Sequence, residues 1–111
     1  MKLFALADVR ERDSVRFPLP DGRREGFAVR VGAEVRAYVN ICPHRLQPVD
    51  VGDGRLWLPN GDLECPAHGA RFDPLTGECT LGACDGRALT PIPFEERDGF
   101  AVTSDVSEPQ S

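Results

Sequence analysis

Hydrophobic and polar residues alternate with a period of two along several short stretches of this chain. Within residues 26–40 every second position is hydrophobic on both sides of a Gly-Ala pair: Phe27, Val29, Val31, Val35, Ala37 and Val39. Successive side chains of a strand point to opposite faces, so this pattern predicts a β-hairpin over 26–40.

Weaker alternation predicts further strands elsewhere. We expect strands at 2–6 and 14–17, and a tight second hairpin over 56–63 around an Asn-Gly pair. Alternating residues over 89–102 predict C-terminal strands with a turn at an Asp-Gly pair. No stretch has a helical period, and at most a short helical turn is expected within 5–13. The predicted fold class is therefore all-β, built from short antiparallel strands.

Turn-forming residues are frequent, which fits many short elements. The chain has 11 Gly and 10 Pro among 111 residues, too many for a helical bundle and too few for a disordered chain. Two loops rich in Cys, His, Pro and Gly are expected at about 41–50 and 64–86. The length suits a single domain, here 1–104, followed by a flexible tail at 105–111.

Charge and hydropathy exclude two classes of partner. The 13 Lys and Arg against 18 Asp and Glu give a net charge of −5, and no basic run could neutralise phosphates, so we expect no nucleic-acid binding. No stretch approaches the roughly 20 apolar residues of a membrane span, and the apolar start is too short for a signal peptide. We therefore expect a cytoplasmic protein, in which four cysteines indicate metal or redox chemistry.

Both histidines of the chain lie within three residues of a cysteine. The first group is Cys42-Pro43-His44 and the second is Cys65-Pro66-Ala67-His68, with 20 residues between His44 and Cys65. Thiolate and imidazole are common ligands of soft and borderline metals. Packed cysteines and surface histidines would rarely pair in this way by chance. Cys42, His44, Cys65 and His68 are therefore a candidate four-ligand metal site.

Two kinds of metal centre fit these four ligands. A structural zinc site takes two Cys and two His, but its ligands usually come as a Cys-Cys pair and a His-His pair. Here each loop supplies one Cys and one His, which favours a two-iron cluster. Cys42 and Cys65 would then bind one iron, and His44 and His68 the other. Zinc remains the alternative.

The two motifs and the segments after them resemble the Rieske [2Fe–2S] proteins. Residues 68–79, which read His-Gly-Ala-Arg-Phe-Asp-Pro-Leu-Thr-Gly-Glu-Cys, are similar to the segment after the second motif in Rieske ferredoxins, and residues 89–92 and 98–99 resemble their C-terminal strands. The resemblance covers about residues 2–103. It implies a Rieske-like antiparallel β-sandwich with a two-loop cluster-binding subdomain, and one [2Fe–2S] cluster per chain.

Within this family, the ligand loops resemble those of low-potential members. Rieske proteins of respiratory complexes carry an extra Cys in each loop, and the first of these positions is Gln47 here. They also have a Ser where this chain has Ala70. Fewer hydrogen bonds to the cluster sulfurs leave the reduced state less stabilised. We expect a midpoint near or below about −100 mV, inside the Rieske range of about −150 to +300 mV.

Two cysteines are left outside the ligand set. Cys79 and Cys84 are expected to pack as small hydrophobic residues, because free cysteines often do so and disulfides are rare in the cytoplasm.

The resemblance implies a stand-alone ferredoxin, a monomer that passes single electrons from a flavin reductase to a terminal oxygenase or similar enzyme. It implies no catalysis by the chain alone. With both histidines assigned to metal, none is left as a general base, and no Gly-rich phosphate loop occurs. One alternative is a small Rieske subunit of a reductase such as nitrite reductase. The other is a structural zinc domain that binds partners.

Overall fold

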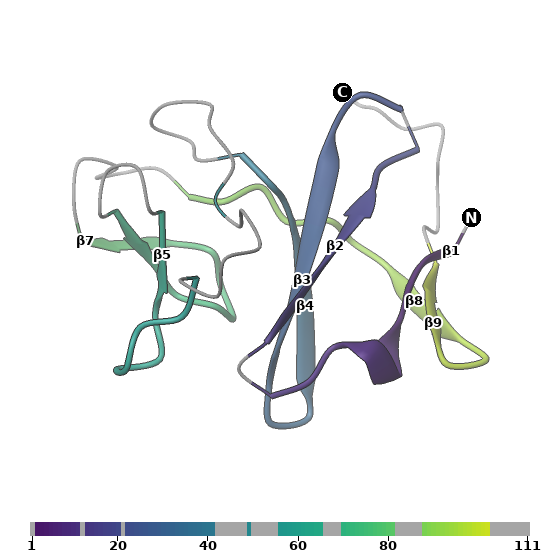
Figure 1. Ribbon diagram of the computed structural model, residues 1–111, viewed down its shortest axis with the longest axis horizontal. Coiled ribbons are helices and arrows are strands. Elements are labelled where there is room, and N and C mark those ends of the chain that lie inside the picture. Colours follow the sequence, from purple (N-terminus) through teal and green to yellow (C-terminus); the bar gives the residue numbers. More distant parts are fainter. Residues whose placement is uncertain are drawn as a thin grey trace.

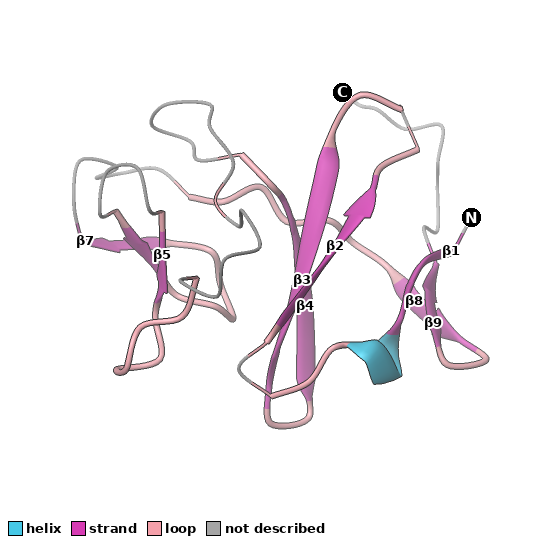
Figure 2. Cartoon of the chain, viewed as in Figure 1, coloured by secondary structure: helices cyan, strands magenta, loops and turns pink. Residues whose placement is uncertain are grey.

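Short antiparallel strands dominate the described part of the chain (Figure 2). The structure is a computed structural model, and it describes residues 2–11, 13–20, 22–41, 49, 56–65, 70–81 and 88–102. The elements within these residues are β1 (Lys2–Ala5), the 3₁₀ turn η1 (Leu6–Asp8), β2 (Ser14–Pro18), β3 (Glu25–Val31), β4 (Glu34–Val39), β5 (Leu63–Glu64), β6 (Arg71–Phe72), β7 (Cys79–Leu81), β8 (Glu95–Arg97) and β9 (Phe100–Val102). The predicted all-β class is confirmed.

The strands form three small sheets, which Figure 1 shows side by side. β2, β3 and β4 form the central sheet, with β1, β9 and β8 on one side and β5, β6 and β7 on the other. Neighbouring named strands pair in the antiparallel sense throughout. The first two sheets correspond to the predicted sandwich. The third corresponds to the predicted subdomain, which carries the second ligand motif.

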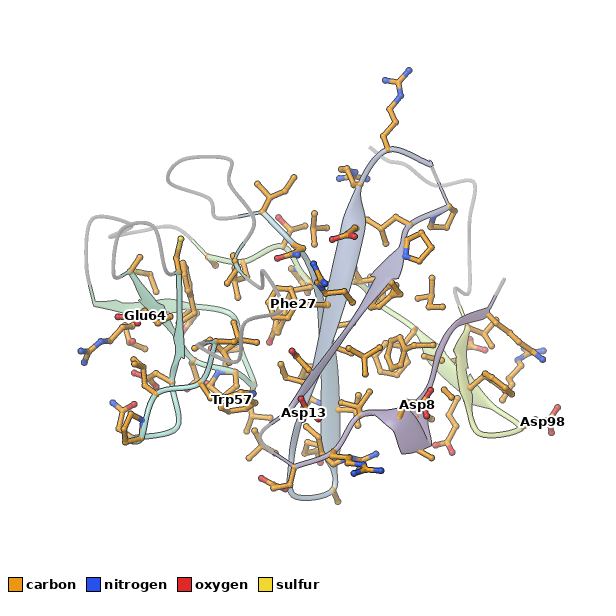
Figure 3. All side chains as sticks on the ribbon, viewed as in Figure 1. Asp8, Asp13, Phe27, Trp57, Glu64 and Asp98 are labelled. Carbon is orange, nitrogen blue, oxygen red and sulfur yellow. The ribbon has the colours of Figure 1, made fainter. Side chains whose placement is uncertain are left out.

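The central sheet buries residues on both of its faces. Phe27 of β3 and Tyr38 of β4 belong to one core cluster, together with Leu63 and Phe72 from the third sheet. Figure 3 shows Phe27 on the side of β3 that faces this third sheet. Alternate residues of the same strands join β1 and β9 in a second core cluster, which holds Leu3, Phe4, Val9, Phe17, Leu19, Ala28, Ala37, Val39 and Ala101. One hairpin thus serves as the middle layer, because neighbouring strand residues point in opposite directions.

The predicted hairpin over 26–40 is confirmed. β3 and β4 pair through six residue positions, and Gly32 turns the chain with a φ of 61°, which glycine adopts without strain. The second predicted hairpin has a reduced form, in which Trp57 and Leu63 make a single isolated bridge. Backbone hydrogen bonds also cross this turn, from the Leu58 N–H to the Asp62 carbonyl and from the Glu64 N–H to the Leu56 carbonyl, each over 2.8 Å.

The predicted strands near the chain ends are confirmed with shifted bounds. β1 and β2 occupy the expected ranges, and the helical turn expected within 5–13 is the three-residue η1. Over 89–102 regular strand structure begins only at β8, since the residues before it include Pro91 and Pro93, which have no N–H to donate. Residues 90–92 still border the central sheet through two hydrogen bonds with β4, of 2.8 and 2.9 Å.

Polar contacts connect the third sheet and its turns to the rest of the fold. The indole Nε1–H of Trp57 donates to the Asp13 carbonyl over 3.3 Å, and Figure 3 shows the two residues close together. The Tyr38 hydroxyl donates to the Pro74 carbonyl over 2.8 Å, which fixes the turn between β6 and β7. These contacts orient the sheet that carries the second ligand motif.

Some predicted regions lie outside the described residues. They include the tail at 105–111 and parts of the predicted loops at 41–50 and 64–86. The single domain over 1–104 therefore stays a prediction. Within the described ranges, no helix has the length and hydropathy to cross a bilayer.

Candidate metal centre

The first ligand loop, predicted at about 41–50, follows the end of β4 at Val39. Cys42 and His44 lie outside the described residues, but both ends of their loop are described. At the near end, the Asn40 N–H donates to the Glu25 carbonyl over 2.8 Å. At the far end, Val49 is buried in the core cluster shared by the central and third sheets. The loop is thus anchored in the fold on both sides of the two predicted ligands.

The second ligand loop joins β5 to β6. Leu63 pairs with Phe72 and Glu64 with Arg71, and the Cys65 N–H then donates to the Ala70 carbonyl over 2.8 Å. Cys65 and Ala70 therefore form the neck of a short hairpin loop. His68 lies inside this loop and outside the described residues. The backbone ladder fixes where the loop begins and ends, whatever side chains it carries.

Cys65 is the one predicted ligand whose surroundings the structure describes. Its side chain is 0% exposed and lies in the core cluster that contains Phe27, Tyr38 and Phe72. Core packing and the backbone hydrogen bond to Ala70 both fix the position of Cys65, and a fixed position suits a metal ligand. Ala70, opposite it, is also fully buried and has no hydroxyl to donate to a cluster sulfide.

A charged side chain adjoins this neck. Arg71 follows Ala70 in β6, and its Nε is buried without a hydrogen-bond partner. Arg71 is thus one residue beyond the neck of the second ligand loop. Sequence reasoning did not single out Arg71.

Sequence reasoning also missed Asn40, the buried polar residue that precedes the first motif by two positions. Its Oδ1 accepts a hydrogen bond from the Val49 N–H over 2.8 Å. One signal in the sequence could have pointed to it. Asn40 is a polar residue that directly follows Val39, the last residue of the alternating pattern of β4.

The prediction for Cys79 was wrong in one respect. Cys79 packs against the core as expected, but it is disulfide-bonded. Its partner lies outside the described residues, as does Cys84. The prediction relied on the reducing character of the cytoplasm and not on where β7 brings the sulfur atom. A disulfide sulfur is not a thiolate ligand, so Cys79 does not compete with the four predicted ligands.

The donor set is consistent with the predicted centre. In the part of the chain that the structure describes, no group of three or more His, Cys, Asp or Glu residues gathers at a possible metal site. The described residues therefore offer no alternative metal site to the one that the Cys/His motifs predict. A buried cysteine at the neck of a loop that contains a histidine fits a cluster that takes both thiolate and imidazole ligands.

Comparison with known proteins decides the family. A model of the Rieske [2Fe–2S] domain matches residues 2–93. This chain belongs to the Rieske [2Fe–2S] domain family. The cofactor is accordingly one [2Fe–2S] cluster per chain, as predicted, and the zinc alternative falls away.

A curated oxygenase component is similar to this chain in sequence. The oxygenase component of dicamba O-demethylase from Stenotrophomonas maltophilia is 36% identical over 72 residues, which are 65% of this chain and 20% of that protein. The chain thus spans about a fifth of the length of this curated relative.

Solved Rieske structures extend the match over nearly the whole chain. The Sphingomonas yanoikuyae B1 ferredoxin superposes with a TM-score of 0.75 at 24% identity, covering 95% of this chain and 97% of that one. A chain in the complex of reduced oxygenase and oxidised ferredoxin in carbazole 1,9a-dioxygenase gives 0.70 at 25% identity, covering 91% and 97%. These comparisons confirm the predicted Rieske ferredoxin fold.

Proposed function

We propose that this chain is a one-electron carrier of the Rieske ferredoxin type, with its cluster held by Cys42, His44, Cys65 and His68. The observation that carries the proposal is the neck of the second loop. There a fully buried Cys65 is fixed by the Cys65–Ala70 hydrogen bond beside the loop that contains His68. The cluster supplies the chain with reversible one-electron chemistry.

The chain's own residues provide binding and insulation in this proposal. The two loops supply the four ligands, and the core around Cys65 keeps water away from the thiolate side of the centre. The two imidazole ligands bring no negative charge, so the potential is raised above that of an all-cysteine site.

The chain is proposed to carry electrons without catalysing a reaction itself. Its two histidines are both assigned to the cluster, which leaves no imidazole for general acid–base chemistry. A two-His-one-carboxylate iron site would need further histidines. The proposed protein therefore needs one enzyme that donates electrons to it and another that accepts them from it.

The proposed partners are a flavin-dependent reductase as donor and a terminal oxygenase as acceptor. The likeness to a chain in a complex of reduced oxygenase and oxidised ferredoxin supports an oxygenase as the acceptor. We propose that the chain acts as a monomer in the cytoplasm. A small reductase subunit of the nitrite-reductase kind remains the alternative.

Counting transferred electrons tests the carrier role without knowledge of the natural partners. The chain, reduced chemically and freed of excess reductant, is mixed with oxidised cytochrome c, and haem reduction is followed by absorbance. We expect one electron to be transferred per chain. A protein that transfers none, or that requires two electrons per turnover, would contradict the proposal.

A further inference from the structure

The two ligand loops are closed at their necks by different means. The second loop continues the β5–β6 ladder, so backbone atoms of Cys65 and Ala70 close it. At the first loop a side chain links the two ends, because the Asn40 Oδ1 accepts the Val49 N–H over 2.8 Å. The neck of the second loop hardly depends on residue identity, whereas that of the first depends on the amide at position 40.

The orientation of the Asn40 amide is determined by its partners. The Val49 N–H can only donate, so it faces the amide oxygen. A carboxylate can only accept, and Glu25 Oε1 lies 3.5 Å from the amide Nδ2. The backbone N–H of Asn40 is also bound, to the Glu25 carbonyl over 2.8 Å. The side chain is thus tied to β3 on one side and to the far end of the loop on the other.

Burial makes this link costly to lose. Asn40 is 5% exposed and Val49 is 1% exposed, so water cannot readily replace the amide oxygen as acceptor. Removing a buried acceptor leaves its donor unsatisfied and carries the full desolvation penalty of that group. Val49 would then either remain unsatisfied in the core or move out of it.

We propose that Asn40 is a positioning residue of the metal centre, whose side-chain amide clamps the neck of the loop that carries Cys42 and His44. The inference rests on the proposed ligand set. The clamp joins the two ends of an eight-residue span, 41–48, and two of the four proposed ligands lie within that span. Loosening it affects one thiolate and one imidazole together, hence both irons.

The first experiment removes the amide oxygen while keeping the branched shape of the side chain. In Asn40→Leu we expect the cluster to be lost to an iron chelator about tenfold faster than in the wild type, the usual scale for residues that support metal ligands. The decay of visible absorbance gives the rate. The electron paramagnetic resonance lines of the reduced protein should also broaden, because the ligands take up a wider range of positions.

A matched control removes the same type of bond elsewhere. The Asn60 Oδ1 accepts the Asp62 N–H over 3.0 Å in an exposed turn. Asn60→Leu should lose its cluster at the wild-type rate. Amide hydrogen exchange provides a readout that does not use the cluster: the Val49 N–H should lose protection in Asn40→Leu and keep it in Asn60→Leu.

A rescue distinguishes the hydrogen bond from general packing, and it serves if Asn40→Leu folds poorly. Asn40→Asp keeps an oxygen for the Val49 N–H but sets a carboxylate against Glu25. Combining it with Glu25→Gln exchanges the amide and the carboxylate between positions 40 and 25. The carboxylate at position 40 then accepts from both the Val49 N–H and the new amide at position 25. We expect the double variant to hold its cluster as the wild type does, and Asn40→Asp alone to lose it faster.

The outcomes separate this inference from the proposed function. A wild-type protein without iron would overturn both. A wild-type protein with a cluster that Asn40→Leu retains equally well would overturn the clamp alone. The clamp is also overturned if the double variant folds but releases its cluster as fast as Asn40→Leu.

Discussion

At the scale of single residues, Tyr38 connects the body of the fold to the sheet that carries the second ligand loop. Its ring lies 5.8 Å from that of Phe27, centroid to centroid, inside the core shared by these layers. Its hydroxyl donates to the Pro74 carbonyl over 2.8 Å. Burial raises the pKa of Tyr38 to about 12. The phenol is therefore held neutral, and its contacts require the proton.

This raised pKa predicts a loss of stability in strong alkali. The unfolded chain releases the Tyr38 proton near its ordinary value of 10.0, while the folded chain keeps it until about pH 12. The stabilisation is thus complete below pH 10 and declines from there through pH 12. Tyr38→Phe should be less stable than the wild type at pH 8, by about 1–3 kcal/mol for the unsatisfied carbonyl. Urea unfolding should show this gap narrowing between pH 10 and 12, whereas a constant gap would contradict the assignment.

The cysteines allow a second test at this scale. Cys65→Ser should abolish the visible absorbance and bound iron of the purified protein, because the buried thiol is replaced by a poor ligand. Cys79→Ser is the matched control: it breaks a disulfide but should leave the iron content unchanged. Iron bound equally by Cys65→Ser and the wild type would refute the ligand set.

At the scale of elements, the turn between β6 and β7 follows the strand that ends the second ligand loop. The Asp73 carboxylate accepts the N–H groups of Leu75 and Thr76 over 2.8 and 3.3 Å. Gly77 closes the turn with a φ of 78°, and its N–H donates to the Asp73 carbonyl over 2.8 Å. A Cβ at this position would lie 2.8 Å from the Tyr38 ring. The turn therefore needs glycine for both conformation and space.

Two glycine substitutions separate these requirements. Gly22 has a φ of 71°, and a Cβ there would meet nothing within 4 Å. Gly22→Ala should cost about 1–2 kcal/mol of unfolding free energy, from the left-handed backbone alone. Gly77→Ala should cost about 1–3 kcal/mol more, because it also crowds the core. Denaturant unfolding of both variants checks this, and equal losses would show that the contact with Tyr38 does not matter.

The elements also show which parts of the fold the sequence could predict. The 26–40 hairpin was accessible because a period of two continues on both sides of Gly32. The two-sided burial of the central sheet was not, since Ala28 and Ala37 carry too little hydrophobic signal to reveal a second core. β5 and β6 have two residues each. These strands exist because they pair with each other across the second ligand loop. Two residues are too few for an alternating pattern to predict them.

The site was predictable to a similar extent. The residue types and spacing of the Cys/His motifs indicated a [2Fe–2S] cluster, with which the family match agrees, while the four ligands themselves stay a prediction. The supporting residues were not accessible. Asn40 acts through contacts with Glu25 and Val49 that lie far apart in sequence, and the Cys79 disulfide depends on three-dimensional proximity.

At the scale of the whole molecule, the net charge of −5 bears on association with redox partners. An acidic protein is attracted over long range to a basic partner, and salt screens this attraction as the Debye length falls from about 30 Å at 0.01 M to about 8 Å at 0.15 M. The rate of electron transfer to cytochrome c, a basic acceptor, should therefore fall severalfold across this salt range. Stopped-flow absorbance measures it, and a rate that rises with salt would contradict the expected steering.

The central claim is a [2Fe–2S] cluster with mixed cysteine and histidine ligands, and its reduction potential tests this most directly. A potentiometric titration of the purified protein, followed by electron paramagnetic resonance, should give a single one-electron transition. With two imidazole ligands and no hydroxyl at Ala70, we expect a midpoint near or below about −100 mV, within the Rieske range. A midpoint near about −400 mV, as in all-cysteine plant-type clusters, or the absence of a redox-active iron signal would contradict the account.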